Sequence, residues 1–273
     1  MQRVTVSILL ALALLAVAAL WLVAPIPQPL WYHDFADKRL LFGIPNFWNV
    51  TSNLPFWFVG AWGIWYSASG SSPGVFHDPT ERWMCLFLFA GVALTGAGSA
   101  YYHLDPNNDR LVWDRLPIAV TLMALLAIII AERASRRAGV ALFLPLVLLG
   151  AATVFYWHLT ESWGRGDLRP YLLAQLYPAV AIPVILWLNP ARYTGAGRLY
   201  SAMAWYISAK IYEFLDKDLY SFGQVVSGHT LKHVGAGVAS YMILSWVRHR
   251  QPIDHQIQPT HLSFRLVQKT APH

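Results

Sequence analysis

The chain has 273 residues, of which 56% are hydrophobic and only 12% are charged. This composition excludes an ordinary soluble domain and indicates a multi-pass membrane protein. The formal net charge of +6 does not indicate a nucleic-acid partner, because the basic residues stand singly or in pairs between apolar runs, where they orient a chain in a bilayer.

A helix needs about 20 apolar residues to cross the hydrocarbon core of a bilayer, and eight segments of the chain have that character. We therefore predict an all-α integral membrane protein, a seven-transmembrane-helix bundle with an additional N-terminal transmembrane or signal-anchor helix. The predicted helices cover residues 4–25, 44–68, 82–104, 114–132, 138–158, 168–189, 198–215 and 226–248.

The first helix is similar to a secretory signal sequence, but Pro25 follows Ala24, where a cleavage site would otherwise fit. We expect an uncleaved anchor, which forms residues 1–43 together with an outer interfacial segment. Residues 44–250 are expected to form the seven-helix domain. Residues 251–273 lack a long apolar face and are expected to be a flexible cytoplasmic tail.

The distribution of lysine and arginine predicts the orientation of the chain. If the eight helices alternate in direction, eleven basic residues fall on the side of the N-terminus and eight on the opposite side. The positive-inside rule then places both termini in the cytoplasm, and the cluster of Arg133, Arg136 and Arg137 strengthens this preference. The polar residues that end the third helix and begin the fourth and eighth helices consequently lie at the outer face.

Two histidines, His229 and His233, open the last predicted helix. Residues four apart lie on one helix face, so both imidazoles can reach one metal ion. The same pattern also fits an interfacial helix start whose histidines are hydrogen-bonded. His103, one turn after Ser99 on the third helix, lies at the same membrane face and makes a third imidazole available.

Three histidines and a water form the usual open coordination of a catalytic zinc ion, whereas a closed structural site commonly uses thiolates, and Cys85 is the only cysteine. Asp114 can receive the proton of an activated water, and Ser99 can donate to an oxyanion. Ser99 can instead be a small residue where helices pack closely. Asp114 can instead cap its helix or pair with Arg110 or Arg115.

These residues carry a family resemblance. Ser99-x-x-x-His103, Asp114 eleven residues on, and His229-x-x-x-His233 resemble the alkaline ceramidase family and, more widely, the seven-helix membrane hydrolases that include adiponectin-type receptors. The resemblance implies a zinc amidase that cleaves the N-acyl bond of ceramide or a ceramide-like lipid to a free fatty acid and a sphingoid-type amine. It also implies the roles of the residues: His103, His229 and His233 as zinc ligands, Asp114 as general base and Ser99 as oxyanion donor.

The resemblance covers residues 44–250 and includes Asn46 to Asn53, which look like the family's first core helix. The amides of this stretch can satisfy backbone groups at a helix terminus or line a polar cavity. Eukaryotic alkaline ceramidases carry an acidic calcium site with a glutamate ahead of Phe-Trp-Asn, where this chain has Asn46. Asp34 and Asp37 remain candidate cation ligands, but calcium usually takes six to eight oxygens. Zinc is therefore the expected cofactor, and a calcium site is left open as the weaker of the two expectations.

Glu213 and Asp216 end the seventh predicted helix on the outer side. They can orient a ligand imidazole by accepting its second N–H, or form ion pairs with Lys210 and Lys217. Lys232 stands between the two histidines in the sequence. It is expected to point off their face and to snorkel or meet an acid.

The sequence thus predicts a zinc-dependent intramembrane hydrolase with a membrane lipid as substrate and its active site near the outer face. Two alternatives stay open: a receptor or metal-binding sensor on the same scaffold, and a lipid acyl-ester hydrolase. Asp114 argues against pure binding, because binding requires no base. A transporter would place its polar groups at mid-membrane depth, whereas here they gather at one face.

Overall fold

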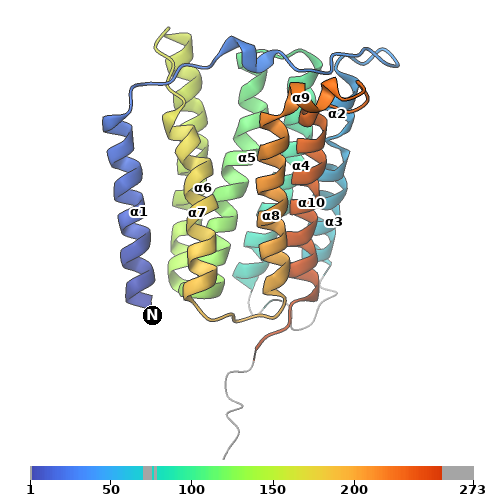
Figure 1. Cartoon of the computed structure of the whole chain (residues 1–273). Helices are drawn as coiled ribbons and strands as arrows, with labels where there is room; N and C mark the ends of the chain where they lie inside the picture. The colour runs from blue at the N-terminus through green and yellow to red at the C-terminus, as the bar shows by residue number, and fades with distance from the viewer. Residues whose placement is uncertain (1, 70–75, 77–78, 254–273) are drawn as a thin grey trace, which may run out of the picture.

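The computed structural model describes residues 2–69, 76 and 79–253, and its regular elements over these residues are all helical. Seven long helices form a bundle, and α1 (Gln2–Leu22) lies along its outside (Figure 1). The expected all-α fold is confirmed. Of the predicted tail, residues 254–273 lie outside the described residues.

Two of the connections between the long helices contain small helices of their own. The small helices are α2 (Phe47–Thr51) and α9 (Asp216–Ser221), and a 3-10 turn covers Leu30–His33. The long helices are α3 (Leu54–Ala68), α4 (Pro79–Leu104), α5 (Asn108–Ile129, continued by a π-helical turn over Ile130–Ala134), α6 (Arg136–Ser162), α7 (Arg169–Leu188), α8 (Ala196–Phe214) and α10 (Gly228–His249). The small helix α2 lies between α1 and α3, and α9 lies between α8 and α10.

Five helices in the described part of the chain are long and apolar enough to cross a membrane, namely α1, α4, α5 with its π-helical turn, α6 and α7. The protein is therefore an all-α membrane protein. The other three long helices do not meet the same criteria, so the predicted count of seven spans plus an anchor stays a prediction. Helix α3 has only 15 residues, and α10 begins with two histidines and a lysine that lower its mean hydropathy.

The prediction of one helix over 44–68 is wrong, because the segment is split between α2 and α3. Pro55 lies in the first turn of α3 and has no N–H with which to continue the α2 hydrogen-bond ladder. The chain turns at Ser52 and Asn53, and both residues are buried. This break places their side chains against the start of α10.

The connection between α1 and α2, residues 23–46, crosses one end of the bundle (Figure 1). At this end α4 finishes and α10 begins, whereas the N-terminus and the last described residues lie at the opposite end. Helix α1 is fastened to α7 by two contacts. Tyr177 Oη donates to the carbonyl of Leu9 at 3.1 Å, and Arg169 Nη1 donates to the carbonyl of Leu20 at 2.7 Å.

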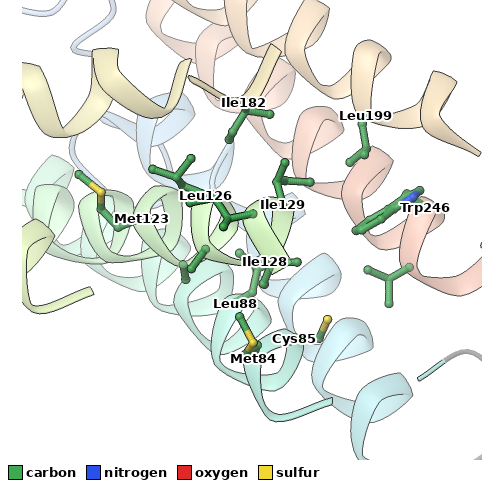
Figure 2. Packing of buried hydrophobic residues seen from close by; sticks show 14 of the residues in the cluster. Met84, Cys85, Leu88, Met123, Leu126, Ile128, Ile129, Ile182, Leu199 and Trp246 are labelled. Atoms are coloured by element: carbon green, nitrogen blue, oxygen red, sulfur yellow. The ribbon is translucent and has the colours of Figure 1, made fainter. Parts of the chain in front are cut away.

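The largest apolar core joins all seven long helices of the bundle, α3 to α8 and α10. Figure 2 shows part of its packing, with Leu88, Leu126, Ile129, Trp246 and Cys85 among the labelled residues. Cys85, the only cysteine of the chain, is fully buried in this core and serves as a packing group. This core fixes the helices whose ends carry the polar residues described below.

Candidate metal centre

Three imidazoles from two helices meet in a compact cluster at the end of the bundle that residues 23–46 cross. His103 comes from the last turn of α4, and His229 and His233 come from the first two turns of α10. Their rings form a nearly equilateral triangle with centroid separations of 4.8, 4.9 and 4.8 Å. The three residues are 1%, 4% and 2% exposed. Sequence reasoning had identified all three, and the fold brings them together.

The spacing of the imidazole nitrogens fits a metal ion. One nitrogen from each ring lies within 4.8 Å of the others, and the Nε2 atoms of His103 and His229 are 3.2 Å apart. Zinc–nitrogen bonds of about 2.0–2.1 Å at a tetrahedral angle require nitrogens about 3.3 Å apart. The cluster can therefore hold a metal, and its all-imidazole donor set is compatible with zinc.

The start of α10 is fixed by caps and by a close approach to α8. Ser227 Oγ accepts from the backbone N–H of Thr230 at 3.1 Å, and Asp216 accepts from the backbone N–H of His229 at 2.7 Å. A side chain at Gly228 would collide with the backbone carbonyl of Tyr212 at 2.2 Å. Asp216 therefore positions the start of α10 through its backbone, and within the described residues its hydrogen bonds are to backbone N–H groups and not to an imidazole.

A serine that sequence reasoning missed orients one of the imidazoles. Ser52 Oγ lies 2.8 Å from His233 Nδ1 and 3.4 Å from the carbonyl oxygen of Asn49. When the serine donates to that carbonyl, its oxygen accepts the Nδ1 proton, and Nε2 of His233 is left free to bind a metal. Only the helix break before Pro55 brings Ser52 to this place, so the local sequence gave no signal for it.

Phe35 is a second missed residue, and it covers the cluster from the crossing segment. Its ring centroid lies 4.6 Å from that of His103 and 4.4 Å from that of His229, and the side chain is buried. The available signal was an aromatic residue between Asp34 and Asp37 in the polar stretch Trp31 to Arg39. Phe35 shields the imidazoles on the side that faces out of the bundle.

Ser99 and Asp114 line the same cavity as His233. Ser99 Oγ is 3.5 Å from His233 Nε2, and both Ser99 and Asp114 are buried. The prediction that the fourth helix begins at Asp114 is wrong, because α5 begins at Asn108 and Asn107 is its cap, accepting from the N–H of Arg110 at 2.9 Å. Asp114 therefore lies in the second turn of α5 and cannot be the cap.

The two arginines that could pair with Asp114 have other partners. Arg110 pairs with Asp105 at 3.4 Å, and Arg115 donates to Gln28 Oε1 at 2.6 Å. Within the described residues, no ion pair involves Asp114. Its carboxylate is therefore available to act on a bound molecule.

The cavity beside the cluster has a volume of about 480 Å³ and runs between α4, α5, α7, α8 and α10. Ser99, Asp114 and His233 belong to its polar part, whereas most of its wall is apolar and includes Ile129, Ile182 and Ile243. Its volume lies in the range of about 300–1,000 Å³ that is usual for small-molecule sites. Such a cavity can take an alkyl chain with its polar end at the imidazoles.

The ion-pair interpretation of Glu213 is confirmed, with an additional partner. Glu213 binds Lys210 at 2.9 Å and Lys232 at 2.8 Å. Lys232 thus meets an acid, as expected. The expectation that it points off the face of the two histidines is wrong, because its Nζ lies 3.4 Å from His229 Nε2. Lys217 pairs instead with Asp34 at 2.8 Å.

Asp34 and Asp37, the candidate cation ligands, are both held by basic side chains. Asp34 binds Lys217 and Lys38, whose hydrogen bonds lower the pKa of its carboxyl to about 2. Asp37 binds Arg39, with 2.9 Å between Oδ1 and Nε. These ion pairs already neutralise the two carboxylates that calcium would need.

The amides of 46–53 donate to backbone carbonyls. Asn46 Nδ2 donates to the carbonyl of His103 at 2.9 Å, and Asn49 Nδ2 to that of Asp37 at 3.2 Å. Asn53 Nδ2 donates to the carbonyl of Asn49 at 2.8 Å. Of the two roles considered for these amides, backbone satisfaction is the one that these contacts support.

Comparison with known proteins assigns the family. A family model described as Ceramidase matches residues 42–189, which is more than half of the chain. The matched region contains Ser99, His103 and Asp114, whereas His229 and His233 follow it. A search of curated proteins finds no match. The chain belongs to the ceramidase family.

Proposed function

We propose that the protein is a zinc-dependent intramembrane amidase that hydrolyses the N-acyl bond of ceramide or a ceramide-like lipid. The observation that carries the proposal is the junction of a buried three-histidine cluster with a largely apolar cavity of about 480 Å³. A lipid amide needs both features, because its acyl chain must be removed from water while its carbonyl reaches a polar centre. Membership of the ceramidase family supports the same reaction.

In this proposal His103, His229 and His233 hold the zinc ion. Zinc held in this way supplies Lewis acidity, which polarises a carbonyl and makes water a stronger nucleophile at neutral pH. Ser52 keeps His233 in the tautomer that can bind the metal, and Phe35 keeps bulk water away from the imidazoles.

Asp114 acts as the general base and then as the general acid. Its carboxylate accepts a proton from the water that attacks the amide carbon, and returns that proton to the amine nitrogen as the carbon–nitrogen bond breaks. The products are a free fatty acid and a sphingoid-type amine. The buried Asp114 carboxylate has no ion pair within the described residues that would oppose this role.

Ser99 donates a hydrogen bond to the oxygen that becomes negatively charged when the carbonyl is attacked. Its hydroxyl lies 3.5 Å from His233 Nε2, so it reaches the space in which the carbonyl would lie. Donors of this kind stabilise the transition state by about 3 kcal/mol in well-studied hydrolases.

The bilayer is both the surroundings of the protein and the source of its substrate. We propose that both termini are cytoplasmic and that the metal centre lies near the outer face. The excess of basic residues on the N-terminal side supports this orientation, as does the position of the cluster at the end of the bundle opposite the N-terminus (Figure 1).

The test compares parent protein with Asp114→Asn on an N-acylsphingosine and on an acyl ester of the same chain length. We expect free fatty acid and the amine from the parent, loss of turnover of about 100-fold or more in Asp114→Asn, and unchanged zinc in both. Ester cleavage without amide cleavage would assign an esterase. Metal with no product from either lipid would favour a receptor or sensor.

A further inference from the structure

Three charged side chains form a chain of ion pairs on the cavity wall next to the metal centre. Glu213, in the last turn of α8, binds Lys210 on the same helix at 2.9 Å and Lys232 on α10 at 2.8 Å. All three residues of this charged triad line the cavity. The side chains of Lys210, Glu213 and Lys232 are 45%, 20% and 14% exposed. A molecule in the cavity can therefore touch them.

The charged triad lies directly beside the three imidazoles. Lys232 Nζ is 3.4 Å from Nε2 of His229, and this nitrogen is the one that lies 3.2 Å from His103 Nε2. Glu213 follows, because its Oε1 accepts from the same ammonium group. The carboxylate is thus two hydrogen-bond lengths from a nitrogen of the cluster. A substituent that stands a few bonds from an amide carbonyl at the cluster can reach the charged triad.

The charged triad has hydrogen-bonding capacity that its own contacts do not use. Within the described residues, Glu213 accepts from Tyr32 Oη at 3.3 Å in addition to the two lysines, and Lys210 donates to Glu213 alone. A carboxylate offers about four lone-pair positions and an ammonium group three donors, so about one acceptor position on Glu213 and about two donors on Lys210 stay open.

A hydroxyl group matches this open capacity. It both donates and accepts, so it can donate to Oε2 of Glu213 and accept from the ammonium group of Lys210. An anionic group would be repelled by the carboxylate between the two lysines, and an apolar group would desolvate the charges without replacing their hydrogen bonds with water. Ionisable side chains that face a cavity between membrane helices commonly mark the path of a substrate.

We infer that the charged triad binds the hydroxyl groups on the amine half of the lipid substrate. The inference rests on the proposed amide hydrolysis, because it requires the amide carbonyl to lie at the imidazoles. In a sphingoid-type amine the hydroxyls stand on the two carbons next to the nitrogen-bearing carbon, which is close enough to the amide to meet Glu213. The favoured substrates are thus N-acyl amino alcohols, and the triad selects them over N-acyl alkylamines.

A matched pair of amides tests the inference. N-hexadecanoylsphinganine and N-hexadecanoyl-2-aminooctadecane share both chains and differ only in the two hydroxyls beside the amide. Kd for both is measured by titration calorimetry in mixed micelles with full-length Asp114→Asn protein, which should not turn over, and kcat/KM for both is measured with the parent. We expect the hydroxylated amide to be preferred about tenfold or more in each quantity, as hydrogen bonds to charged groups would give.

Glu213→Gln keeps the size of the side chain and removes its charge. It should abolish most of the preference by weakening the hydroxylated amide and leaving the other amide nearly unchanged. Lys210→Met keeps the pair of Glu213 with Lys232 and should reduce the preference by less. Because Lys210 is nearly half exposed, this variant serves if Glu213→Gln does not fold. Asp218→Asn is the control: it removes a carboxylate from α9 that does not line the cavity, so the preference should persist.

Equal Kd values for the two amides in the Asp114→Asn protein would overturn the inference, as would a preference that persists in Glu213→Gln and Lys210→Met. Equal weakening of both amides would give the triad a structural role only, and a preference lost in Asp218→Asn would assign it to general surface charge; either result also overturns the inference. A preference in Kd without hydrolysis by the parent would count against the amidase and for the hydroxyl site. Hydrolysis of both amides at equal rates and equal Kd would do the reverse.

Discussion

His103 and His229 face each other with their Nε2 atoms 3.2 Å apart, although 126 residues separate them in the chain. Two unprotonated ring nitrogens present lone pairs to each other at this distance, an arrangement that a proton or a cation between them stabilises. The third imidazole, His233, completes a triangle around the same point. The metal that we propose for this cluster would lie between these nitrogens and would stabilise three imidazoles buried together.

Replacement of any one of the three histidines by alanine should therefore remove the metal. We expect about one zinc ion per chain in the parent and nearly none in His103→Ala, His229→Ala or His233→Ala, because two imidazoles bind zinc far more weakly than three. The measurement is inductively coupled plasma mass spectrometry of purified protein. His158→Ala, which alters a histidine outside the cluster, should keep its zinc. A parent protein without zinc would contradict this prediction.

Ser52→Ala should weaken metal binding without removing a ligand. Loss of the contact to His233 Nδ1 frees the ring to rotate and to change tautomer, and such losses typically cost about 10–100-fold in metal affinity. Competition with a chromophoric chelator measures the effect. Ser67→Ala is the control, since Ser67 is also buried on this part of the chain but lies outside the cluster. Equal affinities in both variants would show that Ser52 does not orient the imidazole.

Phe35→Ala should expose the cluster and speed the loss of metal. The ring packs on His103 and His229, so its removal opens a path for water and costs on the order of 3 kcal/mol of stability. The rate of zinc transfer to a chelator and the thermal midpoint report the two effects. Phe42→Ala removes the same ring from an exposed position in the same connection and should change neither quantity. Unchanged metal release in Phe35→Ala would rule out the shielding role.

Gly98→Ala should push α4 and α5 apart next to the site. A Cβ atom there would lie 1.9 Å from the backbone carbonyl oxygen of Trp113, and backbone cannot move aside without moving Asp114. We expect the free energy of unfolding to fall by roughly 2 kcal/mol, which lowers the thermal midpoint, and we expect turnover to be reduced. Gly197→Ala on α8 meets no atom within 4 Å and should be neutral or stabilising by up to about 1 kcal/mol. Equal midpoints in the two variants would contradict the close approach at Gly98.

Much of the candidate site could be predicted from the sequence, because its residues are spaced one helical turn apart at the ends of apolar segments. Ser99 and His103, like His229 and His233, are one turn apart, so each pair shares a helix face whatever the rest of the chain does. The alternation of helices then placed both pairs at one end of the bundle. The helix boundaries were harder to predict. Asp114 was expected at a helix start, although it lies in the second turn of α5.

Hydropathy and residue spacing thus determined the fold class, the end of the bundle at which the polar residues gather, and the identity of the three imidazoles. These features depend on the period of the pattern and on segment length alone. The tertiary structure alone decided that Ser52 and Phe35 hold and cover the cluster, and that Glu213 meets Lys232 on the cavity wall. Those contacts depend on a helix break, on the path of residues 23–46 across the bundle and on the packing of α8 against α10. Each joins residues distant in sequence, and no local pattern encodes such a contact.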